Sequence, residues 1–120
     1  MIKSVAFIVY AVADPEKSRS FYEGALGLKL SRRWENEWIE YDIGDTSLAI
    51  ARADADNPAG SKRPSVAFEV TDLDAFVAGL KTKGVKIVDD IFDTPVCRMA
   101  VVHDLDGNEF IIHKLKGASH

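Results

Sequence analysis

The sequence predicts an α+β protein built from two βαβββ repeats, which form a cupped, partly closed mixed sheet with the helices outside. Two observations carry this prediction. Asp14 and Asp72 each follow an apolar strand and precede a helical pattern, and they lie 58 residues apart in a chain of 120. The turn segment 41–44 returns as segment 103–107, again directly before a strand. We therefore expect a single domain with repeat 1 at residues 2–52, a linker at 53–64, repeat 2 at 65–115 and a tail at 116–120.

In the first repeat, residues 4–12 are apolar at both the even-numbered and the odd-numbered positions, which predicts a strand buried on both faces. Asp14 can accept hydrogen bonds from the first turn of a helix, and Pro15 suits the first helical position. Gly27 is expected to end that helix. Strands are predicted at residues 28–33, 37–43 and 46–52, with a turn at Gly44 before the last one.

The second repeat begins with a predicted strand at residues 65–70. Asp72 then precedes Leu73, Phe76, Val77 and Leu80, whose spacing is that of one apolar helix face. Further strands are predicted at residues 85–88, 96–103 and 108–115. The segment 53–64 offers little to bury and contains glycine and two prolines, so it is predicted to link the repeats.

Composition excludes several classes of function. The chain is 47% hydrophobic and 28% charged, which is typical of a soluble globular protein. No apolar run approaches the roughly 20 residues of a membrane helix, and a net charge of −4 argues against nucleic-acid or anionic membrane surfaces. Cys97 is the single cysteine, so no disulfide framework is expected. We predict a cytoplasmic protein with no nucleic-acid or membrane partner.

Three segments resemble one family. SFYEGALGLKL at residues 20–30, Val-Thr-Asp at 70–72 and Asp-Leu-Asp-Gly-Asn-Glu-Phe at 104–110 are similar to segments of the vicinal oxygen chelate superfamily. This group includes glyoxalase I, bleomycin-resistance proteins, fosfomycin-resistance enzymes and extradiol dioxygenases. The resemblance covers about residues 2–115 and implies the glyoxalase/bleomycin-resistance fold and a homodimer.

The resemblance also implies where a divalent metal would bind, because enzymes of this family hold one with His and Glu side chains on their strands. The matching positions here fall on Phe7, on or beside Ile50, on Ser65 and on Ile111, and none of these four residues is a His or a carboxylate. A hydroxyl alone is a weak neutral ligand. We therefore predict no cofactor and no metal at this place, and a divalent metal only through a relocated site.

His113 and Glu69 are the candidate residues for catalysis or for a relocated metal. Strand alternation places His113 on the face of Ile111, and Glu69 on the face of Ser65. A His–Glu pair suits general acid–base chemistry. The alternative is that His113 lies exposed or bonded to a backbone carbonyl, and that Glu69 forms a salt bridge with Arg52.

The concave side of the predicted sheet is the expected ligand pocket. Trp34 and Trp38 lie in a hairpin too polar for the deep core, a setting typical of ligand or partner contacts. The alternative is ordinary core packing. The residues predicted to line the pocket are Phe7, Trp34, Trp38, Ile50, Arg52, Ser65, Glu69, Phe92, Arg98, Ile111 and His113.

Three hypotheses for function follow. The first is a metal-free small-molecule-binding homodimer, similar to the bleomycin-resistance branch, whose ligands are aromatic and often cationic. The second is a lyase or isomerase of the glyoxalase type that uses a relocated metal or the His113–Glu69 pair. The third is a structural or regulatory module whose cup is filled by Phe7, Leu48, Ile50 and Ile111.

Overall fold

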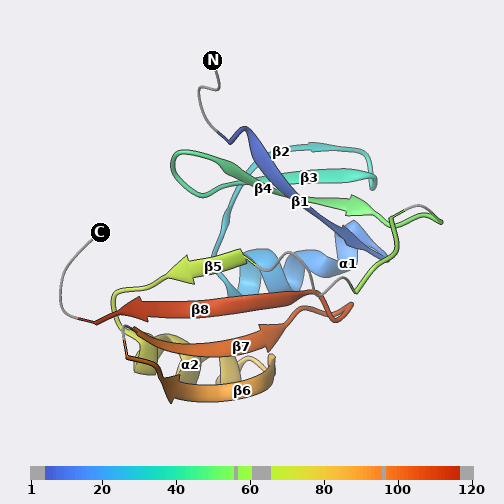
Figure 1. The fold of residues 1–120 in the computed structure, drawn as a ribbon. Helices are drawn as coiled ribbons and strands as arrows, with labels where there is room; N and C mark the ends of the chain where they lie inside the picture. The colour runs from blue at the N-terminus through green and yellow to red at the C-terminus, as the bar shows by residue number, and fades with distance from the viewer. Residues whose placement is uncertain (1–4, 56, 61–65, 96, 117–120) are drawn as a thin grey trace. The chain divides into compact units, whose positions relative to one another are not determined.

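The fold consists of two compact units, residues 1–61 and 62–120, each with its own four-stranded mixed sheet (Figure 1). The computed structural model describes residues 5–55, 57–60, 66–95 and 97–116. The division between the units falls inside the segment 53–64 that was predicted to link the repeats. No helix among the described residues is long and apolar enough to cross a membrane.

The first unit has the predicted βαβββ order. Its sheet, sheet 1, has the strand order β1-β4-β3-β2, with β1 parallel to β4 and the other pairs antiparallel. The elements are β1 (Phe7–Val12), α1 (Pro15–Arg19), η1 (Ser20–Ala25), β2 (Lys29–Trp34), β3 (Trp38–Asp42) and β4 (Ser47–Arg52).

The first helix begins and ends where the sequence predicts. The Asp14 carboxylate accepts hydrogen bonds from the amides of Glu16 (3.1 Å) and Lys17 (3.4 Å), and Pro15 takes the first helical position. The second half, η1, has π-helical geometry, which the sequence did not indicate. Gly27 ends the helix with a φ of 73°, a conformation that glycine adopts without strain.

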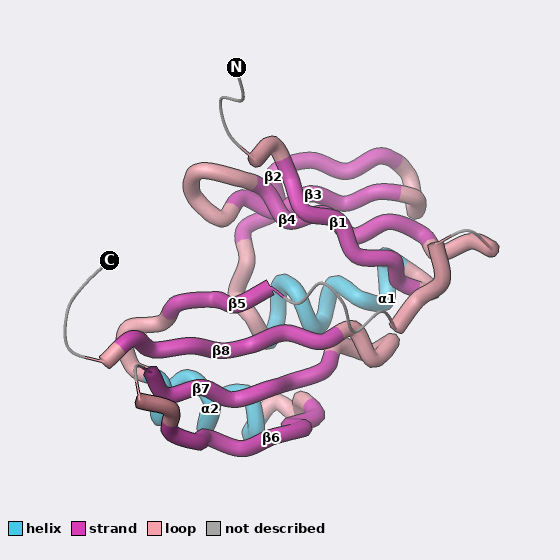
Figure 2. Tube along the Cα trace, viewed as in Figure 1, coloured by secondary structure: helices cyan, strands magenta, loops and turns pink. Residues whose placement is uncertain are grey.

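The second unit repeats this order. Sheet 2 has the strand order β5-β8-β7-β6, with β5 parallel to β8. Its elements are β5 (Val66–Glu69), α2 (Leu73–Thr82), β6 (Lys86–Asp93), β7 (Cys97–His103) and β8 (Glu109–Leu115). Each unit therefore has four strands and one helical region. Figure 2 marks the strands in magenta and the helices in cyan.

Strand β6 runs to Asp93, five residues beyond the predicted end at residue 88. Its pairing with β7 shifts register between Ile87 and Asp89 and again between Asp89 and Phe92. Each shift breaks the two-residue alternation from which a strand is predicted. The extension was therefore missed because its side chains follow no single parity.

Strand β1 is half-buried, so the prediction of burial on both faces was wrong. Tyr10 and Val12 are 5% and 0% exposed, whereas Phe7 and Val9 are 46% and 48% exposed. The buried residues lie on the face covered by the helix, where Tyr22 stacks on Tyr41 with ring centroids 5.8 Å apart. We call the opposite face of each sheet its helix-free face. The strands form two four-stranded mixed sheets, as the predicted α+β fold requires, and neither sheet is closed.

The turn before β8 explains the 104–110 motif structurally. Asp104 is buried, and its Oδ1 accepts hydrogen bonds from the amides of Asp106 (2.9 Å) and Asn108 (2.8 Å). Its Oδ2 accepts from the side-chain nitrogen of Asn108 at 2.8 Å. Buried polar groups are retained when they are paired in this way. The Asp104 carboxylate thus serves the turn.

Candidate ligand-binding site

The helix-free face of sheet 1 carries a pocket of about 240 Å³. Strands β1, β3 and β4 supply most of its lining, and the segment after β4 supplies the rest. The lining residues are Val9, Ala11, Trp38, Ala51, Arg52, Asp54 and Asn57.

The floor of this pocket is made of small side chains. Ala11 of β1 lies directly opposite Ala51 of β4, and Ala51 lies opposite Trp38 of β3. Residues paired across neighbouring strands project from the same face. Two methyl groups beside one indole therefore leave a hollow whose wall is the Trp38 ring.

The Trp38 ring is held on two sides. Its Nε1 donates a hydrogen bond to Glu40 Oε1 at 2.9 Å. Its ring meets the Phe7 ring edge-on, with centroids 5.4 Å apart and an interplanar angle of 89°. A side chain that is fixed before binding loses little conformational entropy when a ligand packs against it.

The polar wall begins with Arg52 at the end of β4. Its Nε donates to the backbone carbonyl of Asn36 at 3.2 Å and lies 3.3 Å from Glu37 Oε2. Its Nη1 donates to the carbonyl of Ala13 at 3.1 Å. Arg52 thereby joins the end of β1 to the β2–β3 turn.

Asp54 and Asn57 complete the wall, although they belong to the segment predicted to be only a linker. The Asn57 amide donates to Asp54 Oδ1 at 2.8 Å, and the Asp54 amide donates to the Asn57 carbonyl at 3.1 Å. The Ala53 amide donates to the carbonyl of Val12 at 2.7 Å, which fixes this turn to β1. The start of the linker is therefore part of the pocket.

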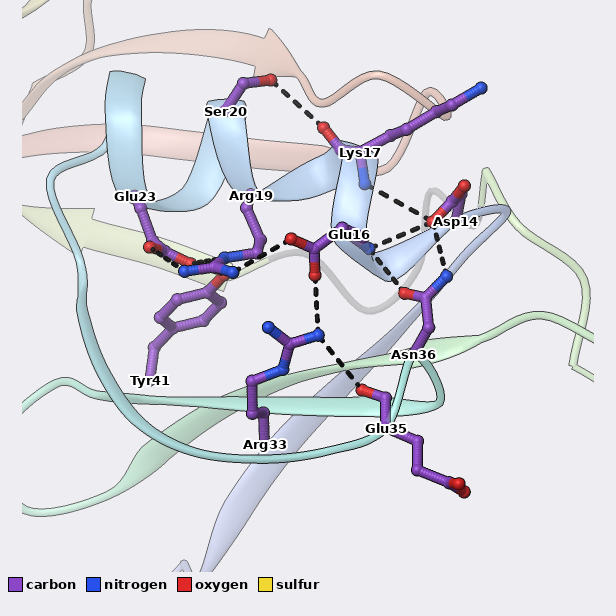
Figure 3. A network of polar contacts seen from close by, with 10 residues as sticks. All are labelled: Asp14, Glu16, Lys17, Arg19, Ser20, Glu23, Arg33, Glu35, Asn36 and Tyr41. Atoms are coloured by element: carbon purple, nitrogen blue, oxygen red, sulfur yellow. Dashed lines mark hydrogen bonds and ion pairs between the residues drawn. The ribbon is translucent and has the colours of Figure 1, made fainter.

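A polar network anchors the β2–β3 turn to the start of α1 (Figure 3). The Asn36 side chain donates from Nδ2 to Asp14 Oδ1 at 2.9 Å and accepts at Oδ1 from the Glu16 amide at 2.7 Å. The hydrogen bond from Asn36 is the largest cause of the lowered pKa of Asp14. Glu35, beside Asn36, has a φ of 48°, an uncommon conformation for a residue other than glycine.

The same network continues into the core through Glu23. Arg19 donates to both carboxylate oxygens of Glu23, at 2.6 and 3.1 Å, and the Tyr41 hydroxyl donates to Glu23 Oε2 at 2.9 Å (Figure 3). These donors lower the pKa of Glu23, with Arg19 the largest cause. The pKa of Tyr41 is raised, mainly by burial of its side chain and secondly by its hydrogen bond to the Glu23 carboxylate.

Four of the residues predicted for the pocket lie on the helix-free face of sheet 1 or at its edge. Trp38 and Arg52 line the pocket, and Phe7 supports Trp38. Trp34 lies opposite Trp38 in the hairpin and is 66% exposed. Ile50 was placed wrongly: it lies opposite Tyr10, fully buried on the helix side of the sheet.

In the second unit, His113 and Glu69 are brought together as register partners on β8 and β5. His113 Nδ1 lies 2.5 Å from Glu69 Oε1, and Glu69 Oε2 accepts from the Leu115 amide at 2.9 Å. Within the first unit, Arg52 makes its ion pair with Glu37.

The remaining predicted residues divide between the faces of sheet 2. Ile111 and Phe92 share the helix-free face with His113, through their partners Ala67 and Met99. Arg98 lies on the other face, where it forms two hydrogen bonds to Asp74 of α2, at 3.0 and 3.2 Å. Arg98 is therefore a link between helix and sheet. Ser65 lies outside the described residues.

The residues at the metal positions implied by the family do not fit a metal. Phe7, Ile50 and Ile111 have hydrocarbon side chains, and Ile50 points to the helix side of its sheet. Within residues 5–55, 57–60, 66–95 and 97–116, no three His, Cys, Asp or Glu side chains are grouped so that they could hold a metal ion. A divalent ion needs several nitrogen or oxygen donors.

Comparison with known proteins identifies the family. Residues 4–112 match the model of the Glyoxalase/Bleomycin resistance protein/Dioxygenase superfamily, and the chain belongs to this superfamily. No curated protein matches the chain.

Several solved structures are similar along almost their whole length. TnmS3, an antibiotic binding protein from Streptomyces sp. CB03234, is 29% identical with a TM-score of 0.83, and the match covers 96% of this chain and 98% of that one. A glyoxalase/bleomycin resistance protein from the same organism is 31% identical with a TM-score of 0.76, covering 91% and 98%. Lactoylglutathione lyase from Agrobacterium tumefaciens, at 14% identity, a TM-score of 0.77 and 95% coverage of both chains, shares the fold.

The Glu23 network predicts acid-sensitive stability. The folded-state pKa of Glu23 is below its ordinary value of 4.5, so its contribution is complete above pH 4.5 and is lost as the pH falls through the folded-state pKa. Glu23→Gln should lower the free energy of unfolding by about 1.5–3 kcal/mol at pH 7, the range for hydrogen bonds to a charged group. Urea unfolding at pH 7 and pH 3 measures the difference.

Glu35→Gln is the control, because it removes the same charge from an exposed side chain of the same network region. It should change stability by less than about 0.5 kcal/mol at either pH. An equal loss in both variants, or a loss from Glu23→Gln that is no smaller at pH 3 than at pH 7, would contradict the assignment.

Proposed function

We propose that this chain is a metal-free small-molecule-binding protein that takes an aromatic ligand into the pocket on the helix-free face of sheet 1. The observation that carries the proposal is the fixed indole of Trp38 standing beside the Ala11–Ala51 floor. Aromatic rings pack well against a tryptophan face, and binding sites are commonly concave and mostly apolar with a few placed polar groups.

The pocket volume sets the size of what it holds. A dry cavity of about 150 Å³ is large enough for benzene. The pocket of about 240 Å³ therefore suits one substituted ring or two fused rings. A larger ligand would place one such part in the pocket and leave the remainder outside.

The family comparisons support binding rather than a particular reaction. The similar TnmS3 is named an antibiotic binding protein, and none of the residues at the family's metal positions is a His or a carboxylate. A homodimer in the cytoplasm stays a prediction from the resemblance and from the single cysteine. The filled-module hypothesis loses support, since Leu48 and Ile50 are buried on the helix side and do not occupy the pocket.

A second candidate function is acid–base catalysis of the lyase or isomerase type on sheet 2. It is favoured by one observation, the 2.5 Å contact of His113 Nδ1 with Glu69 Oε1. With Glu69 ionised, His113 donates from Nδ1 and keeps Nε2 as a proton acceptor, the arrangement in which a carboxylate orients a histidine base. We rank it second because a partner nucleophile or electrophile is not evident among the described residues near it.

Filling the pocket should abolish binding. The Ala51→Leu substitution adds three carbons to the floor of the pocket beside Trp38. For any aromatic ligand found by a thermal-shift screen, the dissociation constant should therefore rise at least about tenfold, or 1.4 kcal/mol. Calorimetry measures the dissociation constant. The matched control is Ala67→Leu, an exposed alanine on the helix-free face of sheet 2, which should bind as the wild type does. Equal affinity in all three proteins would exclude this pocket.

Metal titration and activity assays on chelator-stripped protein distinguish the two candidate functions. We expect nickel, zinc, manganese and cobalt to give only weak heats, unchanged in His113→Ala, and glyoxalase-type lyase assays to give no turnover. His103→Ala is the control for loss of a histidine from the same sheet. Tight one-to-one metal binding or turnover that is lost in His113→Ala but kept in His103→Ala would favour the enzyme.

A further inference from the structure

One polar group on the pocket wall has hydrogen-bonding capacity that the residues described in the structure do not use. Arg52 donates from Nε to Asn36 and from Nη1 to Ala13, and it pairs with Glu37. A guanidinium carries five N–H donors, two of them on Nη2. Within the described part of the chain, Nη2 has no hydrogen-bond partner.

The guanidinium is held in place before any ligand arrives. Its three partners come from the end of β1 and from the β2–β3 turn, so they fix the plane of the group from two segments. An arginine held in this way loses less rotamer entropy on forming a further hydrogen bond than a free surface arginine does. Nη2 is therefore a preorganised donor.

We infer that the ligand is an uncharged aromatic molecule carrying a carbonyl oxygen, with its ring against Trp38 and its oxygen accepting from Arg52 Nη2. This inference rests on the proposed function and names the ligand class of the same pocket. Trp38 and Arg52 line one hollow, so the ring and the oxygen of a small ligand can meet both groups at once.

The carboxylates around the pocket disfavour an anion, and the remaining donors of Arg52 favour a ligand with an acceptor atom. Two carboxylates, Asp54 and Glu37, lie on the wall or beside Arg52, so an anionic ligand would meet two like charges. A cationic ligand would face the N–H donors of Arg52 and offer them no acceptor. A carbonyl oxygen takes the unused hydrogen bonds without adding net charge.

Four planar probes of similar shape test this inference: acetophenone, α-methylstyrene, benzoate and benzamidinium. Trp34→Phe leaves Trp38 as the sole tryptophan of the chain, so fluorescence quenching reports the pocket. Acetophenone should bind most tightly of the four. Its preference over α-methylstyrene, which replaces the carbonyl oxygen with a CH₂ group, should fall about tenfold in Arg52→Lys, the factor that one hydrogen bond to a charged donor supplies.

Arg32→Lys, a change at an exposed arginine of β2, is the control and should leave the preference unchanged. Far-UV circular dichroism checks that the Arg52→Lys variant folds. The order of the affinities of the four probes for the Trp34→Phe protein, which keeps Arg52, tests the inference independently of that variant. Tightest binding of benzamidinium or benzoate, or equal affinity for acetophenone and α-methylstyrene, would overturn the ligand class and leave the pocket standing. Binding of none of the four probes would overturn the proposed function itself.

Discussion

The side-chain amide of Asn36 is the contact on which the first unit's candidate site depends. It satisfies the first helical amide donors together with Asp14, and its backbone carbonyl accepts from Arg52 (Figure 3). One residue of a turn thus ties the start of α1 to the wall of the pocket. Because Trp38 follows this turn directly, the position of the indole is set by the same contact. The uncommon backbone conformation of Glu35 is consistent with a turn held by its neighbours.

The second constraint is the alternation of side chains along the strands. On sheet 1, the large apolar residues at alternating positions pack beneath the helix. The positions between them face the opposite side, where Ala11, Ala51 and Trp38 lie together. A pocket forms where small residues of two strands meet a large residue of a third. The floor of the hollow therefore follows from side-chain size on one face, and the turn after β4 completes its wall.

Local signals in the sequence were enough to predict the repeats and the helix starts, and they named His113 and Glu69 as candidates while leaving their pairing open. Asp14 and Asp72 act on amides within three residues, and β5 and β8 are regular, so counting along them gave the correct face. Counting failed for Ile50, since an offset of one residue moves a side chain to the opposite face and the register of β4 against β1 is set by tertiary packing. The lining by Asp54 and Asn57 was missed because a turn of this kind looks like any polar linker.

Nuclear magnetic resonance tests the central claim most directly. ¹⁵N-labelled Trp34→Phe protein contains one indole N–H, that of Trp38, and it can be titrated with acetophenone. The account predicts that this indole signal shifts together with the amide signals of Ala11, Ala51 and Asn57, with one common dissociation constant. Shifts confined to sheet 2 around Met99 and His113, with the Trp38 indole unchanged, would contradict it.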